Sequence, residues 1–102
     1  MRCITVLYPN PEGVRFDFDY YTKKHATLIT RLYGKGIARY ELRKGLSAPD
    51  GSRPPYVATV HFWIGSQADF DAAQAKHTAE LIADVPNFTN VQPTIQIDEV
   101  VS

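Results

Sequence analysis

At 102 residues the chain has the length of one domain, and its 11 Lys plus Arg residues balance its 11 Asp plus Glu residues. With no net charge and no basic run, the sequence argues against a nucleic acid or an acidic membrane surface as a partner. The single cysteine, Cys3, excludes an internal disulfide framework and a zinc site made of thiolates, and it fits a cytoplasmic location. No apolar run approaches the roughly 18 residues that a membrane span needs, so we expect no membrane partner.

The first third of the chain predicts a strand, a turn and an amphipathic helix. Residues 3–8 are β-branched and aromatic, and the prolines and glycine of residues 9–13 end this strand. Asp17 has the position of a helix N-cap, and Gly34 or Gly36 would end the helix. One helical stripe carries apolar side chains and a single histidine: Phe18, Tyr21, His25, Leu28, Ile29 and Leu32.

The remaining elements are two strands, a second helix and a last strand. Residues 37–44 and 56–64 alternate as strands do, with a loop rich in Gly, Pro and Ser between them. Ser66 opens a capping box for a helix that Pro86 ends, and residues 94–100 form the last strand. The apolar stripe of this second helix also contains a histidine: Phe70, Ala73, His77 and Leu81.

The order β-α-β-β-α-β, without internal repeats, predicts one α+β domain over residues 1–102 with a ferredoxin-like fold. Its four strands would form an antiparallel sheet, and both helices would cover the same face. The other face would expose Val57 and Trp63 to water, with Cys3 and Leu7 as further candidates. A second copy packed sheet to sheet about a two-fold axis would cover this patch, so we predict a homodimer.

The same residues resemble the EthD family, within the dimeric α+β barrel proteins. The likeness begins with the strand that ends in Leu7-Tyr-Pro-Asn-Pro11 and with Phe16-Asp-Phe-Asp-Tyr-Tyr-Thr-Lys-Lys-His25. It continues in Ile82-Ala-Asp-Val-Pro-Asn-Phe-Thr-Asn90 and in Gln92-Pro-Thr-Ile-Gln-Ile-Asp-Glu-Val100, so it covers essentially the whole chain. The pattern Tyr-Tyr-x-x-x-His, in this order of elements, is its specific part.

One position departs from the family pattern. The histidine is usually followed by one residue, a proline and a leucine, whereas this chain has His25-Ala-Thr-Leu28. With Thr27 in place of the proline, we expect a straighter helix and a differently shaped pocket. The resemblance implies a dimer whose sheets face each other, with a pocket in each protomer between the sheet and its helices. It selects no reaction, because the superfamily supports many.

His25 is the main candidate for chemistry, with Tyr21 one turn away on the same helix face. Imidazole titrates near neutrality and could act as a general acid or base, and partial burial would keep it neutral. Tyr21 could donate a hydrogen bond to a developing oxyanion. The structural alternatives are a core histidine bonded to a backbone carbonyl or a tyrosine hydroxyl, and a tyrosine that only packs at the helix start.

Three further residues are expected to line the pocket. Tyr8 ends the first strand and could close the pocket mouth, and Phe62 lies on the face of its strand that turns away from the dimer contact. His77 repeats the pattern of His25 on the second helix, so the two rings could face one cavity. Ordinary packing explains Tyr8 equally well, and structural filling is the alternative for His77.

The sequence predicts neither a metal nor a cofactor. His61 alternates with Phe62 onto the face assigned to the dimer, and none of the histidines has the spacing of a metal site. A phosphate-binding glycine loop and a dinucleotide fingerprint are also missing.

Two functions remain as hypotheses. The first is an enzyme that binds a small apolar or aromatic oxygenated metabolite, in which His25 moves a proton during an isomerisation, dehydration or decarboxylation without a cofactor. The second is a non-catalytic accessory protein with the same pocket, which binds a hydrophobic metabolite in a degradation pathway such as ether breakdown.

Overall fold

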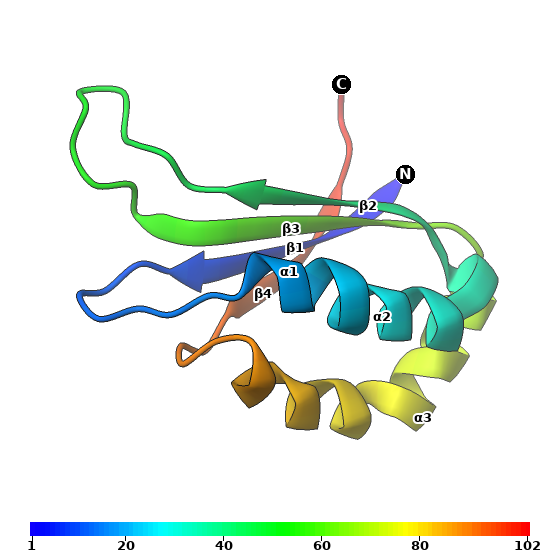
Figure 1. The fold of residues 1–102 in the computed structure, drawn as a ribbon. Coiled ribbons are helices and arrows are strands. Elements are labelled where there is room, and N and C mark those ends of the chain that lie inside the picture. The colour runs from blue at the N-terminus through cyan, green and yellow to red at the C-terminus, as the bar shows by residue number, and fades with distance from the viewer.

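Two layers make up the structure: a four-stranded antiparallel sheet and the helices that lie against one of its faces (Figure 1). The computed structural model describes residues 1–102. In chain order the elements are β1 (Arg2–Pro9), α1 (Phe18–Tyr20), the π-helical turn η1 (Tyr21–His25), α2 (Ala26–Tyr33), the short helical turn η2 (Gly34–Gly36), β2 (Ile37–Lys44), β3 (Tyr56–Ile64), α3 (Gln67–Asp84), the short helical turn η3 (Val85–Asn87) and β4 (Thr94–Glu99). None of the helices is long and apolar enough to span a membrane.

The strand order β2-β3-β1-β4 is that of a ferredoxin-like sheet, which confirms the predicted α+β fold. The central strands β1 and β3 pair so that Val6 lies opposite Val60 and Ile4 opposite Phe62. Residues that lie directly opposite each other share one face of a sheet, and this face is the one that the helices cover. The two central strands therefore supply the floor of the hydrophobic core.

The first helical segment is not the continuous α-helix that the sequence predicts. In η1 the backbone N–H of Ala26 donates to the carbonyl of Tyr21, five residues earlier rather than four. The additional residue in this turn rotates the rest of the helix relative to the sheet. As a result Ala26, Ile29 and Tyr33 are buried in α2, whereas the predicted core residue Leu28 is only half-buried.

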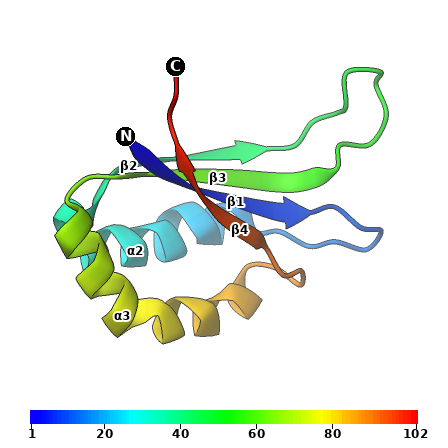
Figure 2. The same ribbon diagram turned by 180° about the vertical axis from the view of Figure 1, so that it is seen from behind.

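The sheet face away from the helices is less apolar than the sequence suggests. The Arg39 guanidinium lies 3.7 Å from the centre of the Trp63 ring, which it covers, and Cys3 is buried. Large exposed apolar side chains occur instead on β4, where Ile95 and Ile97 are each 60% exposed. Figure 2 shows β4 at the edge of the sheet, next to β1, where it leads to the C-terminus.

The core floor makes a prediction about stability. Val60 is fully buried, so Val60→Ala loses apolar burial and leaves a small void, and the free energy of unfolding should fall by about 2 kcal/mol. Val101→Ala is the matched control, because Val101 is 89% exposed and its removal should change stability by less than about 0.5 kcal/mol. Urea denaturation followed by circular dichroism measures both; equal losses would contradict the assigned core.

Candidate functional site

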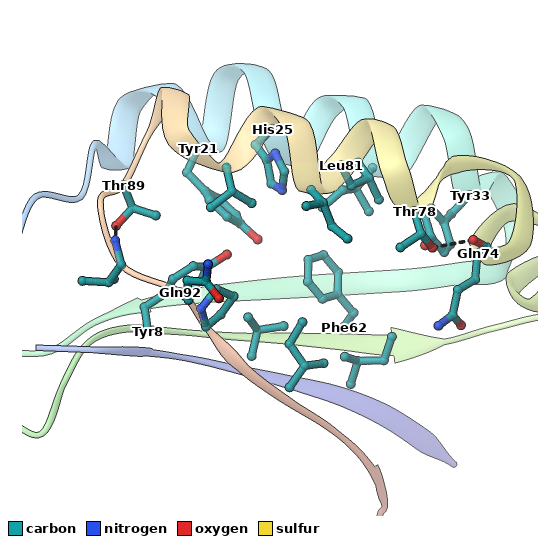
Figure 3. A pocket seen from close by; sticks show the side chains of 18 of the residues that line it. Tyr8, Tyr21, His25, Tyr33, Phe62, Gln74, Thr78, Leu81, Thr89 and Gln92 are labelled. Atoms are coloured by element: carbon teal, nitrogen blue, oxygen red, sulfur yellow. Dashed lines mark hydrogen bonds between the residues drawn. The ribbon is translucent and has the colours of Figure 1, made fainter.

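A cavity of about 700 Å³ lies between the helices and the sheet. This volume is within the range of small-molecule sites, which are mostly apolar with a few polar groups. Hydrophobic residues make up 14 of the 22 that line it. Its walls come from β1 and β3 below, from η1 and α2 on one side, and from α3 and the segment that leads into β4 on the other (Figure 3).

The π-helical turn η1 brings Tyr21 and His25 to the same wall of the cavity. Only 1% of Tyr21 and 4% of His25 is exposed, and their ring centroids are 5.1 Å apart. Figure 3 shows both rings pointing from the helix toward the sheet. Single π-helical turns occur often at functional sites, where they re-aim side chains that an α-helix would direct elsewhere.

The His25 ring is held by a carboxylate from the other helix. His25 Nδ1 lies 2.7 Å from Oδ2 of Asp84, which is the last residue of α3. The second carboxylate oxygen of Asp84 accepts hydrogen bonds from the Tyr20 hydroxyl at 2.7 Å and from the Asn87 side-chain amide at 3.0 Å. The Tyr20 hydroxyl and the Asn87 amide both donate to this carboxylate, which favours its ionised form.

These contacts determine the protonation of the site. Burial raises the pKa of Asp84, but the hydrogen bonds from Asn87, His25 and Tyr20 outweigh it and leave the pKa below its usual value. Burial lowers the pKa of His25 below 6.5, although the Asp84 carboxylate opposes this change.

At neutral pH His25 is therefore a neutral imidazole. Because an ionised carboxylate can only accept, Nδ1 of His25 carries the hydrogen and donates it to Asp84. The lone pair of Nε2 is then left for a ligand in the cavity.

Two tyrosine hydroxyls add neutral donors at the same end of the cavity. Burial raises the pKa of Tyr8 and that of Tyr21 well above the usual value, and the nearby Tyr8 hydroxyl raises the pKa of Tyr21 further. Both side chains line the cavity, and their rings meet edge to face with centroids 6.5 Å apart. Since both stay protonated at neutral pH, each can donate a hydrogen bond to a ligand oxygen.

The Phe88 ring packs against both His25 and Tyr21 at this end of the cavity. It is fully buried, and its ring centroid lies 4.7 Å from that of His25 and 5.1 Å from that of Tyr21. The carbonyl of Phe88 accepts a hydrogen bond from the backbone N–H of Asp17, the N-cap of α1. The loop after α3 is thereby fixed to the start of the first helix, which orients the catalytic candidates from two sides.

Four of the five residues that the sequence assigns to the site line the cavity: Tyr8, Tyr21, His25 and Phe62. The placement of His77 beside them is wrong. His77 lies in an outer groove between α2 and α3 with Arg31 and Lys76, and its Nδ1 is 2.8 Å from Oε1 of Glu80. Consecutive residues point about 100° apart on a helix, and here it is the neighbouring Thr78 that faces the cavity.

The partner of His25, Asp84, is not among the site residues that the sequence predicts. Asp84 stands in the last turn of α3, where the helix dipole disfavours a negative charge, and this conflict is the signal that could have singled it out. Tyr20 is half-buried, and its hydroxyl reaches Asp84 from the start of the first helical segment. The third histidine, His61, is separate from both others, with its Nδ1 3.4 Å from the Thr5 hydroxyl on the open sheet face.

Comparison with known proteins places the chain in a family. A model of the EthD domain matches residues 13–92. The chain belongs to the EthD family. An EthD-like protein from Ralstonia eutropha JMP134 is 37% identical to it, covers 99% of this chain and 92% of its own, and superposes with a TM-score of 0.90. No curated protein matches the chain.

Two more distant structures share the fold. An ethyl tert-butyl ether d (EthD) family protein from Bacillus halodurans C-125 is 21% identical over 99% of both chains, with a TM-score of 0.72. HapK from Hahella chejuensis is 19% identical over 100% of this chain and 95% of its own, with a TM-score of 0.58. The ferredoxin-like architecture of this EthD protein therefore recurs at low sequence identity.

The pairing of His25 with Asp84 predicts the direction of a pKa change. Asp84→Asn removes the charge that raises the pKa of His25, so this pKa should fall further below 6.5. An NMR titration of the carbon-bound ring protons of His25 measures it. Asp71→Asn, at an exposed position of the same helix, is the control and should leave the titration unchanged. A raised or unchanged His25 pKa in Asp84→Asn would contradict the assigned pair.

Proposed function

We propose that this EthD protein binds a small apolar or aromatic oxygenated metabolite in the cavity and moves a proton on it, with His25 as the acid and base. One observation carries the proposal. A buried imidazole is fixed through Nδ1 by the Asp84 carboxylate, 2.7 Å away, at the wall of an otherwise mostly apolar cavity. This arrangement keeps Nε2 basic and desolvated, which suits a general base near neutral pH.

The first step would be the removal of a proton from a carbon next to a carbonyl group. The proton passes to Nε2 of His25, and the electron pair of the broken C–H bond moves onto the carbonyl oxygen. The Tyr21 hydroxyl donates a hydrogen bond to this oxyanion, with Tyr8 as a second donor. In a substrate with a neighbouring C=C bond, returning the proton from Nε2 to the far carbon of the conjugated enolate completes an isomerisation. In a substrate with a hydroxyl group on the next carbon, the C–O bond breaks, the electron pair of the enolate forms the new C=C bond, and the hydroxyl group takes the proton from Nε2 and leaves as water, which completes a dehydration. Neither route requires a cofactor.

The local energetics of Asp84 support a functional reason for its position. A negative charge in the last turn of a helix costs about 0.3–1 kcal/mol, and α3 has no basic residue there to offset it. Partial burial of the carboxylate adds a further desolvation cost. Residues that break a local rule in this way tend to lie at functional sites. Here the cost is offset by three hydrogen bonds, one of which sets the tautomer of His25.

The alternative is an accessory protein that binds the metabolite without changing it. The apolar character of the lining supports this reading, because 14 of its 22 residues are hydrophobic and burial alone could hold a ligand. In that case the Asp84–His25 pair would position a ligand oxygen rather than transfer a proton. The cytoplasm stays our proposed location in either case, since Cys3 is a free buried thiol.

Exchange of carbon-bound protons distinguishes the two functions. β-Tetralone, a small aromatic ketone, serves as the probe, and its deuterium uptake from heavy water is followed by proton NMR with and without the protein. His25→Gln should lower the protein-dependent rate by about 10²-fold or more while the ketone still binds. The rate should also fall as the pH drops through the His25 pKa, below 6.5, because the protonated ring has no lone pair.

His77→Gln is the matched control, since this second histidine lies outside the cavity and its loss should leave the exchange rate unchanged. A ketone that binds without any exchange, or equal rates in the wild type and His25→Gln, would favour the accessory protein over the enzyme.

The proposed assembly is a homodimer that packs sheet to sheet. The half-buried Trp63 and His61 on the open sheet face support it, because no helix covers this face. A dimeric ferredoxin-like protein from Thermobifida fusca has the same fold at 16% identity and a TM-score of 0.55, over 97% of this chain and 89% of its own.

Sedimentation at micromolar concentration tests the dimer. We expect twice the 11.5 kDa mass of one chain, and Trp63→Glu should shift the protein toward the monomer by placing a charge in the contact. Lys35→Glu, in η2 at the helix side, is the control and should remain dimeric. A monomeric wild type would refute the assignment of Trp63 to a subunit contact.

A further inference from the structure

A second group of hydrogen-bonding side chains lies in the cavity, away from His25. Tyr33, the last residue of α2, is 8% exposed, and Gln74 and Thr78 lie about one turn apart on α3 at exposed positions. All three line the cavity, and Figure 3 shows them together at the end opposite to Tyr8 and Tyr21. The proton transfer proposed for His25 makes no use of them.

This group offers both donors and acceptors. Burial raises the pKa of Tyr33, although the adjacent Thr78 hydroxyl lowers it, so Tyr33 is a neutral donor at pH 7. The Thr78 hydroxyl donates to the backbone carbonyl of Gln74, which leaves its oxygen lone pairs as acceptors. The Gln74 side chain adds an amide that can donate and accept.

The surface between the two ends is apolar. Ile29, which follows His25 by one turn, lines it from the helix side. Leu81 of α3 also lines it, and Phe62 forms the floor (Figure 3). Tyr33 follows His25, the last residue of η1, by eight residues at the end of α2, which at 1.5 Å per residue corresponds to about 12 Å. A single ring bound at His25 would leave the Tyr33 end of such a slot unfilled, whereas two linked rings would span it.

We propose that Tyr33, Thr78 and Gln74 form a distal subsite, so that the preferred ligand is an elongated aromatic compound with a hydroxyl or carbonyl group at each end. One oxygen would lie at His25 and Tyr21, the rings would pack between Phe62 and Leu81, and the second oxygen would bond the distal subsite. The inference rests on the proposed function in one respect, that the reacting end of the ligand lies at His25.

Two stilbenes test the distal subsite. The first probe is trans-stilbene with one para hydroxyl group on each ring, and the second lacks one of the two hydroxyls; calorimetry gives the Kd of each. The wild type should bind the diol about three- to tenfold more tightly, as expected for one additional hydrogen bond. Tyr33→Phe, which keeps the ring and its contact with Phe70, and Thr78→Val should each reduce this preference, and the double variant should abolish it.

Matched variants separate the two ends of the cavity. Thr30→Val is the control for Thr78→Val, because Thr30 also donates to a backbone carbonyl of its own helix but does not line the cavity, and it should keep the preference. His25→Gln should weaken both probes by a similar factor. Equal affinity of the wild type for the two probes, no binding of either, or a preference that survives in the double variant would overturn the inference. If the preference depends on Tyr33 and Thr78 but His25→Gln leaves the affinity of both probes unchanged, the subsite is supported and the proposed function is contradicted.

Discussion

The hydrogen bond between His25 and Asp84 is the constraint on which the site depends. It joins the π-helical turn η1 to the last residue of α3, across 59 positions of sequence, at a distance of 2.7 Å. Because Asp84 also accepts from Tyr20 and Asn87, the carboxylate cannot move without losing several donors at once. The imidazole is therefore held in one tautomer and one orientation at the wall of the cavity.

The cavity is enclosed at the end where His25 lies and is exposed on the side of β4. Phe88 fills the space behind His25 and Tyr21, and its backbone is tied to the N-cap Asp17. Toward β4 the lining becomes exposed, with Ile82 at 65% and Ile95 at 60%. A ligand would thus enter beside β4 and meet fixed donors at the closed end, which is the arrangement that orients a reacting group with little loss of side-chain entropy.

The EthD fold alone does not select a chemistry. Ferredoxin-like sheets support many unrelated functions, and the distant relatives of this chain share its architecture at low identity. Proton transfer is supported instead by the environment of one ring, where desolvation lowers the pKa of His25 and the Asp84 carboxylate partly restores it. Opposing effects of this kind keep an imidazole near the pKa at which it can both accept and return a proton.

The sequence by itself determined the strands, the caps and the fold class, because these follow from local patterns. Residues 37–44 and 56–64 are strands as predicted, and Asp17 and Ser66 cap their helices through their side chains. It also singled out His25 and Tyr21 as candidates, since helical periodicity alone places a polar ring on an apolar stripe.

Only the tertiary structure decided which groups meet them. Asp84 and Phe88 reach His25 from the far end of the chain, and the π-helical turn changes which residues of α2 face inward. For the same reason His77, placed by helical periodicity alone, was assigned to the wrong side of α3. Periodicity gives the angle around a helix axis, but the packing of the whole chain sets which angle faces the cavity.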